Sequence, residues 1–386
     1  MSMPESASCT AAYSVRNILD SSKVPLLLKN RADKWNITKT WTLEDWGQNI
    51  GFSKLLPFRC GQNFHTEEPQ WESLCVKKDL TMRQFIDHCL SNDVSAEWLY
   101  FDYKHLNEWF QDNEDFLKDI DWGIVGFPER KKSDSTLWIG SKGAHTPCHV
   151  DTYGFNLIAQ IYGQKQWFLF PPESGEILKA TRVPYEESSI YSQINFFSPS
   201  EVESLDAYVV TLDPGDVLLV PNGWWHYVET ISEAAISLNT WVPLASDAHK
   251  QLEEALVKLF VSSVCRLSSN ASKILNPNES NLEDENILNY IQWATEASKK
   301  LSLDEKPPAA KRACLDLNEL PEGISRLKIF PADQFRKILR LKRKNISKRS
   351  STILQNDTDF ELSRRLINAM CSQQVLATIA SKITNE

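Results

Sequence analysis

Three features that mark other classes of protein are missing from this sequence of 386 residues. Its eight cysteines include no CxxC pair, so a structural zinc site of the usual spacing is not expected. The first residues lack a charged region followed by an apolar one, and we therefore expect no secretory signal. No apolar run reaches the roughly 20 residues of a membrane-spanning helix. These absences predict a cytoplasmic protein with reduced thiols and no role in a membrane.

Aromatic residues and charges are unevenly distributed along the chain. Twelve of the 13 tryptophans precede residue 242, which predicts an aromatic-rich core in the first two thirds. From Glu305 onward there are 16 Lys and Arg against 9 Asp and Glu, a net charge of +7. The residues before it carry 26 against 42, a net charge of −16, within a total of −9. Because an acidic body repels phosphates, nucleic acid is disfavoured as a partner.

The residue patterns divide the chain into five segments. These are an α/β region at 12–130, a strand-rich region at 131–245, a helical extension at 246–302, a basic linker at 303–350 that we expect to be disordered, and a helical segment at 351–386. Within the first segment, helices are predicted to start at Thr42, which has a capping-box pattern, and at Thr81.

The strand-rich region consists of short apolar runs separated by turns that contain Gly, Pro or Asp. The runs are TLWIGS, FNLIAQIYGQKQWFLFPP, AYVVTL, VLLVP, WWHYVET and AAISLNTWV. Closely spaced strands without a helical period are typical of a sandwich or a barrel. We therefore predict a mainly β fold with flanking helices.

A candidate metal site begins with His149 and Asp151, which are separated by one residue. On a strand, residues two apart point to the same face, so both side chains can bind one ion, whereas Cys148 points away. The third ligand must come from another strand, and His226 in PNGWWHYVE is the candidate. Two histidines and one carboxylate form the facial triad of non-haem Fe(II) oxygenases. Alternatively, these residues are ordinary polar side chains of a β-sandwich.

Three motifs that contain these residues resemble those of a known family. HTPCHVD, IYGQKQWFLFPP and PGDVLLVPNGWWHYVE are similar, in this order, to motifs of the JmjC-domain Fe(II)/2-oxoglutarate oxygenases, which belong to the cupin superfamily. The resemblance covers roughly residues 20–245 and is nearest to the hydroxylase-like group of the family. It implies a double-stranded β-helix, or jelly roll, followed by C-terminal helices, with His149, Asp151 and His226 as catalytic metal ligands.

The resemblance also implies a set of residues that bind the co-substrate 2-oxoglutarate. Lys165 matches the cation that pairs with the distal carboxylate, Thr146 matches a hydroxyl beside it, and Tyr100 is a looser match for a second hydroxyl. Asn156 and Asn239 match amides near the iron, although one residue is inserted before Asn156. Each also has a plain structural interpretation, such as a solvated hairpin lysine for Lys165.

The implied activity is the Fe(II)- and 2-oxoglutarate-dependent hydroxylation of a protein side chain, and a link to small heat-shock proteins in the stress response is expected. Two alternatives stay open: a non-catalytic module that binds a small heat-shock protein, and a histone-type lysine demethylase. Within the enzyme class, an RNA-base hydroxylase is disfavoured by the acidic body. The sequence does not identify the substrate.

The C-terminal third offers two further hypotheses. The apolar stripes at 246–265 and 359–383 are candidates for a homodimer interface, although helices that pack on their own barrel have the same pattern. The basic segments 308–312 and 335–349 are candidates for nuclear import, although charge runs are commonly just solvated.

Overall fold

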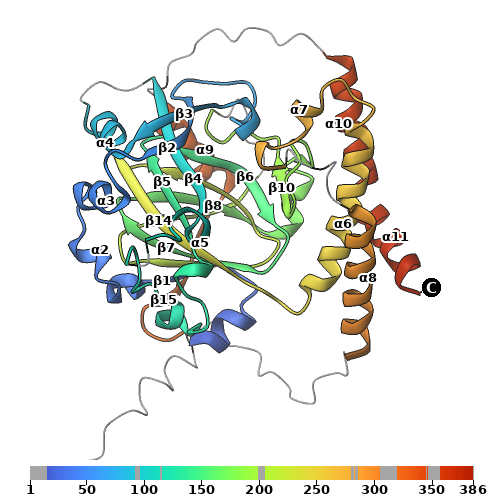
Figure 1. Ribbon diagram of the computed structural model, residues 1–386, viewed down its shortest axis with the longest axis horizontal. Coiled ribbons are helices and arrows are strands. Elements are labelled where there is room, and N and C mark those ends of the chain that lie inside the picture. Colours follow the sequence, from blue (N-terminus) through green and yellow to red (C-terminus); the bar gives the residue numbers. More distant parts are fainter. Residues whose placement is uncertain are drawn as a thin grey trace, which may run out of the picture.

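A computed structural model of the chain describes residues 15–91, 96–113, 115–198, 205–279, 286–304, 320–344 and 357–385, with residues 282 and 346. In this part of the chain, two antiparallel sheets of nine and seven strands face each other, and helices lie on either side of them (Figure 1). Between residues 136 and 170, and again between 207 and 242, successive strands alternate between the two sheets, as in a jelly roll. The predicted fold class is therefore confirmed.

In both sheets the spatial order of the strands differs from their order along the chain. From one edge to the other, the nine-stranded sheet contains β15 (Ile324–Arg326), β1 (Leu26–Leu28), β12 (Val217–Val220), β7 (Phe155–Tyr162), β14 (Ala234–Val242), β5 (Thr136–Ser141), β4 (Glu97–His105), β2 (Leu55–Gln62) and β3 (Val76–Thr81). The seven-stranded sheet contains β16 (Lys328–Phe330), β11 (Ala207–Leu212), β8 (Lys165–Phe170), β13 (Trp225–Thr230), β6 (His145–Asp151), β10 (Ser189–Ser192) and β9 (Ala180–Thr181).

The turn between β7 and β8, where the chain crosses from the nine-stranded to the seven-stranded sheet, shows how local sequence sets the strands. Gly163, in its turn, has φ +60, and a Cβ there would lie 2.0 Å from the carbonyl oxygen of Ala234. Only glycine combines this left-handed backbone with so close an approach. The tight turn leads directly into β8, whose first residue is Lys165.

Helices near the N-terminus cover the nine-stranded sheet on its outer side. They include α2 (Ile37–Thr40), α3 (Leu43–Ile50), α4 (Met82–Leu90) and α5 (Leu106–Trp109). As predicted, α3 begins after Thr42 and α4 after Thr81. Thr42 forms the predicted capping box with Asp45, and Thr81 forms a second one with Gln84. The core beneath them is rich in aromatic residues and includes the fully buried Trp46, Trp122 and Phe101, as the tryptophan distribution predicts.

The C-terminal helices pack beside the seven-stranded sheet (Figure 1). They are α6 (Asp247–Cys265), α7 (Ala271–Ile274), α8 (Ile287–Asp304), α10 (Thr358–Met370) and α11 (Gln373–Asn385). The apolar stripes of α6 and α10 meet in one cluster, in which Leu256 and Ile367 are buried. Packing within one chain thus buries part of these stripes, whereas Leu362, Leu366 and Val375 are exposed, and dimerisation stays a prediction.

The predicted disordered linker at 303–350 is wrong for residues 320–344. These residues add β15 to one sheet and β16 to the other, and then form the helix α9 (Ala332–Arg343). Phe335 and Leu339 of α9 are buried against the outer face of the seven-stranded sheet. Residues 305–319 and 347–350 lie outside the described part of the chain, and so does the basic segment 308–312.

Candidate metal centre

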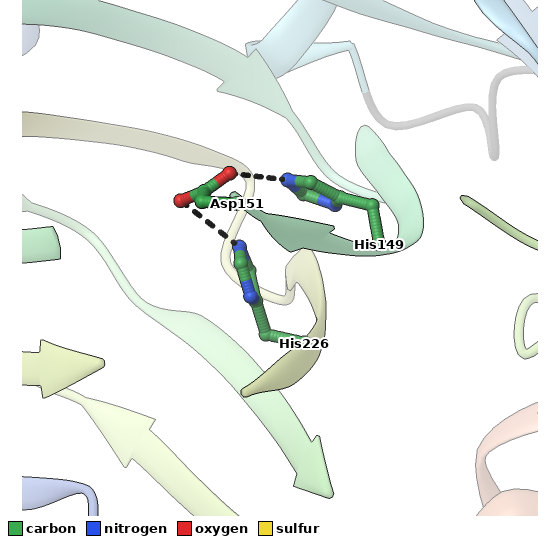
Figure 2. Close-up of side chains that lie close together, drawn as sticks. All are labelled: His149, Asp151 and His226. Atoms are coloured by element: carbon green, nitrogen blue, oxygen red, sulfur yellow. Dashed lines mark ion pairs between the residues drawn. The ribbon is translucent and has the colours of Figure 1, made fainter. Parts of the chain in front are cut away.

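His149, Asp151 and His226 meet at the pairing of β6 with β13. The backbone register places His226 directly opposite His149, and Asp151 lies two residues further along β6 on the same face. His149 Nε2 is 3.5 Å from Asp151 Oδ1, and His226 Nε2 is 3.8 Å from Asp151 Oδ2 (Figure 2). One ligand atom from each residue lies within 4.8 Å of the other two. The structure thus brings the predicted triad together.

Both imidazoles are held so that Nε2 faces the centre of the triad. His149 Nδ1 lies 2.9 Å from the carbonyl oxygen of Pro147, and His226 Nδ1 lies 3.0 Å from that of Trp224. A proton on Nδ1 donates to these carbonyls and leaves the Nε2 lone pair free for a metal ion. The backbone of each strand therefore selects the tautomer of its own histidine.

Burial and mutual charge set the ionisation of the triad. Burial alone would raise the pKa of Asp151, but the adjacent imidazoles of His149 and His226 hold it well below its usual range. Burial and the neighbouring His149 lower the pKa of His226 to about 4. At neutral pH the site therefore offers a carboxylate and a neutral imidazole, the forms that bind metal.

The side chains of Trp241 and Asn156 orient Asp151. Its Oδ2 accepts hydrogen bonds from the Trp241 indole (2.9 Å) and from Asn156 Nδ2 (3.2 Å). Asn239 Nδ2 donates to Asn156 Oδ1 at 2.8 Å, and the Trp138 indole donates to Asn239 Oδ1 at 2.7 Å. Trp241 and the chain from Trp138 through Asn239 to Asn156 thus fix the carboxylate. Despite the residue inserted before it, Asn156 reaches the triad.

Lys165 is buried in the same cavity, with neutral groups as its hydrogen-bond partners. It is 2% exposed, and its Nζ donates to Ser237 Oγ at 2.8 Å and to the Tyr100 hydroxyl at 3.3 Å. Burial lowers the pKa of Lys165 to about 7, because the charge of Asp102 offsets the loss of hydration only in part. A buried amine of this kind is completed by an anion.

The cavity that contains these groups lies between the two sheets and has a volume of about 290 Å³. All eight residues singled out in the sequence line it, Tyr100 from β4 and the others from β6, β7, β8, β13 and β14. The Thr146 hydroxyl is buried there and has no hydrogen-bond partner of normal geometry among the described residues. The cavity therefore contains a hydroxyl and an amine that are both suited to bind a ligand.

These residues fit the groups that the family resemblance implies. Two imidazoles and one carboxylate suit Fe(II) and leave further coordination positions open. Lys165, Tyr100 and Thr146 suit a carboxylate of a small dicarboxylic acid, because they offer a buried cation and two buried hydroxyls in one cavity.

The sequence reasoning missed Ser237 and did not assign a role to Trp241. Both lie on β14 at two-residue spacing from Asn239, and side chains at this spacing share one face of a strand. With Asn239 placed in the cavity, the alternation of side chains along β14 would have identified Ser237 and Trp241 as cavity residues.

Comparison with known proteins now identifies the class. A family model described as Cupin-like domain matches residues 12–244, and the chain belongs to this family. The stretches STLWIGSKGAHTPCHVDTYG, TRVPYEESSIYS and VLLVPNGWWHYVE further predict a likeness to a JmjC protein associated with a small heat-shock protein. Curated relatives of the chain confirm this likeness.

The chain is 37% identical over 280 residues to HSPB1-associated protein 1 of Bos taurus, which covers 67% of this chain and 58% of the bovine protein. It is 35% identical over 318 residues to HSPB1-associated protein 1 homolog of Danio rerio, covering 76% and 70% of the two chains. It is 25% identical over 225 residues to Lysine-specific demethylase JMJ30 of Arabidopsis thaliana, covering 56% and 49%. The match thus spans less than two thirds of the mammalian relatives.

Among the helices of the described residues, none is both long and apolar enough to span a lipid bilayer.

Proposed function

We propose that the protein is an Fe(II)- and 2-oxoglutarate-dependent oxygenase that hydroxylates a protein side chain. The observation that carries this proposal is the buried amine of Lys165, which lines the same cavity as the His149, Asp151 and His226 triad. A metal site alone is compatible with many activities. A metal site that shares a cavity with a buried cation is what a chelating dicarboxylate requires.

Different residues of the cavity would bind the metal and the co-substrate. His149, Asp151 and His226 would hold Fe(II), which supplies the activation of O₂ when it is bound. Lys165 and the hydroxyls of Tyr100 and Thr146 would hold the distal carboxylate of 2-oxoglutarate. For each substrate C–H bond converted to C–OH, one O₂ and one 2-oxoglutarate are consumed, and one succinate and one CO₂ are formed.

The protein would contribute by holding the metal ligands in position and by excluding water. Trp241 and Asn156 keep Asp151 in one orientation, and Trp167, whose ring stacks on His226 with centroids 5.9 Å apart, restrains that imidazole. The apolar residues packed between the sheets keep bulk water away from the amine of Lys165.

The test is turnover of 2-oxoglutarate by the purified full chain. NMR would follow succinate formation with Fe(II), ascorbate and peptide mixtures, with the double variant His149→Ala/Asp151→Ala as the inactive control. His88→Ala, on the distant helix α4, is the matched histidine control. Binding of 2-oxoglutarate without any succinate above the double variant would contradict the proposal.

Two other functions are supported by the relatives. The name HSPB1-associated protein 1 supports an interaction with a small heat-shock protein, as a substrate or as a stable partner. The name Lysine-specific demethylase supports removal of N-methyl groups. Hydroxylation leaves a product 16 Da heavier and demethylation one 14 Da lighter, so mass spectrometry of the product distinguishes the two.

Cytoplasmic residence with nuclear import through 308–312 and 335–349 is a further proposal. The second segment overlaps α9, in which Arg343 is buried. A receptor that reads an extended basic segment would have to detach the end of this helix. Comparison of a fluorescent fusion of the full chain with its Lys311→Ala/Arg312→Ala variant tests the first segment without disturbing α9.

A further inference from the structure

Tyr103 has a strained backbone beside the metal centre. Its φ is +56, in the left-handed region that bulky residues avoid because their Cβ crowds the following carbonyl oxygen. Five non-glycine residues in the described part of the chain have a positive φ, and Tyr103 is the only aromatic one among them. The residue is also 39% exposed, so burial of its ring offers only partial compensation. An outlier of this kind in the wall of a functional cavity indicates that the conformation serves the site.

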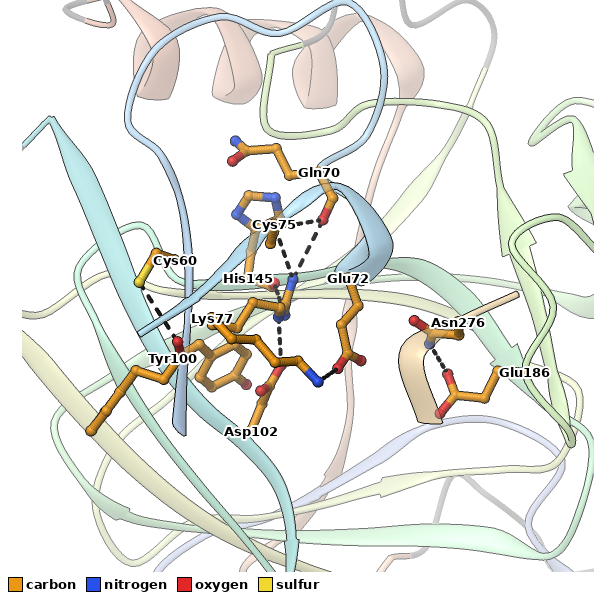
Figure 3. A network of polar contacts seen from close by, with 12 residues as sticks. Cys60, Gln70, Glu72, Cys75, Lys77, Tyr100, Asp102, His145, Glu186 and Asn276 are labelled. Atoms are coloured by element: carbon orange, nitrogen blue, oxygen red, sulfur yellow. Dashed lines mark hydrogen bonds and ion pairs between the residues drawn. The ribbon is translucent and has the colours of Figure 1, made fainter. Parts of the chain in front are cut away.

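A β-bulge in β4 imposes this conformation. Between Phe101 and Lys104, β4 has one residue more than the stretch of β5 with which it pairs. Asp102, at the start of the bulge, is fixed by the buried Arg59, whose Nε lies 2.7 Å from Asp102 Oδ2. Figure 3 shows Asp102 within this polar network. With Asp102 held in place, the backbone of Tyr103 absorbs the extra residue, and bulges beside functional sites re-aim a side chain in this way.

The ring of Tyr103 lies against two tryptophans of neighbouring strands. It meets the ring of Trp138 on β5 edge to face, with centroids 5.6 Å apart, and the ring of Trp241 on β14 in the same way at 5.9 Å. β4, β5 and β14 are adjacent in the nine-stranded sheet, and all three rings line the metal cavity. They form one aromatic wall, in which Tyr103 contacts both indoles.

These two indoles are the groups that fix the metal-binding carboxylate. The Trp241 indole donates directly to Asp151 Oδ2 at 2.9 Å. The Trp138 indole reaches the same oxygen through the two asparagine side chains described above. Rotation of either indole would break one of these connections. Tyr103 therefore lies where a single ring restrains both routes to Asp151.

We propose that Tyr103 is a positioning residue of the metal centre, whose ring holds the indoles of Trp138 and Trp241 in the orientation that fixes Asp151. The strain in its backbone is retained because the conformation orders the metal site. The inference rests on the metal centre of the proposed oxygenase, and it adds a residue that acts on Asp151 through other side chains.

The test separates the ring of Tyr103 from its backbone with three variants. Tyr103→Phe keeps the ring, while Tyr103→Ala and Tyr103→Gly both remove it. Equilibrium dialysis of the full chain with Mn(II) should give wild-type affinity for Tyr103→Phe. For Tyr103→Ala and Tyr103→Gly we expect equal losses of about tenfold, at the lower end of the usual effect of changing a group that orients a metal ligand.

Urea denaturation of the metal-free variants should rank them differently. Tyr103→Gly should be more stable than Tyr103→Ala, because glycine adopts a φ of +56 without strain. At an ordinary strand position the order would be the reverse. If Tyr103 had a purely structural role, metal affinity would follow stability, and Tyr103→Gly would bind Mn(II) more tightly than Tyr103→Ala.

Tyr162→Ala is the matched control. It removes a partly buried ring at the end of β7, outside the cavity, and should keep wild-type metal affinity. Wild-type affinity in Tyr103→Ala, a loss in Tyr103→Phe as large as in Tyr103→Ala, or an affinity that follows stability overturns the proposal. Absence of Mn(II) binding by the wild type overturns it too. Succinate formation is measured separately, so a chain that binds Mn(II) as expected but forms no succinate contradicts the oxygenase function alone.

Discussion

Arg343 and Glu229 form a buried, two-point ion pair that ties helix α9 to the strand of the metal centre. Arg343 Nη2 lies 2.5 Å from Glu229 Oε2, and Nη1 lies 3.0 Å from Oε1. Both side chains are 6% exposed. Glu229 is on β13, the strand that also carries His226, and it accepts a further hydrogen bond from the Tyr227 hydroxyl at 2.9 Å.

Replacement of Arg343 by Ala is therefore expected to lower the free energy of unfolding by about 1.5–3 kcal/mol, because Glu229 loses its bidentate hydrogen bonds and keeps only Lys342, whose Nζ lies 3.2 Å away. The triple variant Arg343→Met/Lys342→Met/Glu229→Met should lose less than Arg343→Ala, since it removes all three charges and restores much of the volume. Urea denaturation of the three proteins gives these values. Lys337→Ala, at a side chain that is 72% exposed on the same helix, should change stability by less than about 0.5 kcal/mol. A loss in Arg343→Ala as small as in this control would show that the pair is dispensable.

The same helix shows where sequence reasoning fails. The segment 335–349 carries eight Lys and Arg and no acidic residue, which predicts a solvated charge run or an import signal. Within it, Phe335, Leu339 and Arg343 follow the i, i+4, i+8 spacing of one helix face, and all three are buried. The third position of the stripe is occupied by an arginine, and its buried partner lies 114 residues earlier. Local pattern cannot reveal a partner at that distance.

The metal triad, in contrast, was accessible from the sequence. Strand alternation places His149 beside Asp151, and the motif around His226 identifies the partner strand. Ser237, Glu186 and Asn276 also line the cavity, but the sequence could not identify them in this way. Ser237 requires that β14 be placed opposite Lys165, and Asn276 reaches the cavity only through the backbone pairing of Tyr185 with Leu275. Positions set by tertiary contacts between distant loops have no periodic signal.

If the protein binds a small heat-shock protein, as we propose from its relatives, and does so through the outer surface of the domain, that binding should not depend on the metal. The double variant His149→Ala/Asp151→Ala changes side chains that are 14% and 18% exposed inside the cavity, so it leaves the outer surface unaltered. We therefore expect it to bind HSPB1 with the affinity of the wild-type chain in a surface plasmon resonance titration. A loss of binding in the double variant that 2-oxoglutarate and Mn(II) also modulate in the wild type would instead place the partner at the cavity as a substrate.

Replacement of Trp241 by Phe is expected to weaken metal binding by about 10–100-fold, the usual effect of removing a group that orients a metal ligand. The substitution keeps an aromatic ring but deletes the indole N–H that donates to Asp151 Oδ2 at 2.9 Å. Equilibrium dialysis with Mn(II) measures the change. Trp109→Phe, on α5 and away from the triad, is the matched control. Equal metal affinity in the two variants would mean that Asn156 alone holds the carboxylate.

Lys165 gives the binding of 2-oxoglutarate a defined pH dependence. In the free cavity, burial lowers the pKa of Lys165 to about 7, whereas an anionic ligand favours its charged form and raises the pKa. Above pH 7 the ligand must therefore bind together with a proton, and its affinity should fall by up to about tenfold per pH unit until the pKa of the complex is reached. Below pH 7 this contribution should be constant, because Lys165 is already charged in the free protein.

Calorimetry of the Mn(II)-loaded protein at pH 8.5, in two buffers of different ionisation enthalpy, should reveal uptake of about one proton per 2-oxoglutarate bound. Lys165→Met should bind weakly and without proton uptake, while Lys142→Met, at a side chain that is 60% exposed, should behave as the wild type.

The stability of the ligand-free protein gives an independent check, in which the effect of rising pH has the opposite sign. Without ligand, the unfolded chain holds the Lys165 proton up to its ordinary pKa while the folded chain releases it near pH 7. The wild type should therefore gain stability relative to Lys165→Met as pH rises from 7 towards about 10.4. If the two proteins show parallel stability profiles over this interval, the amine is not buried as the cavity requires.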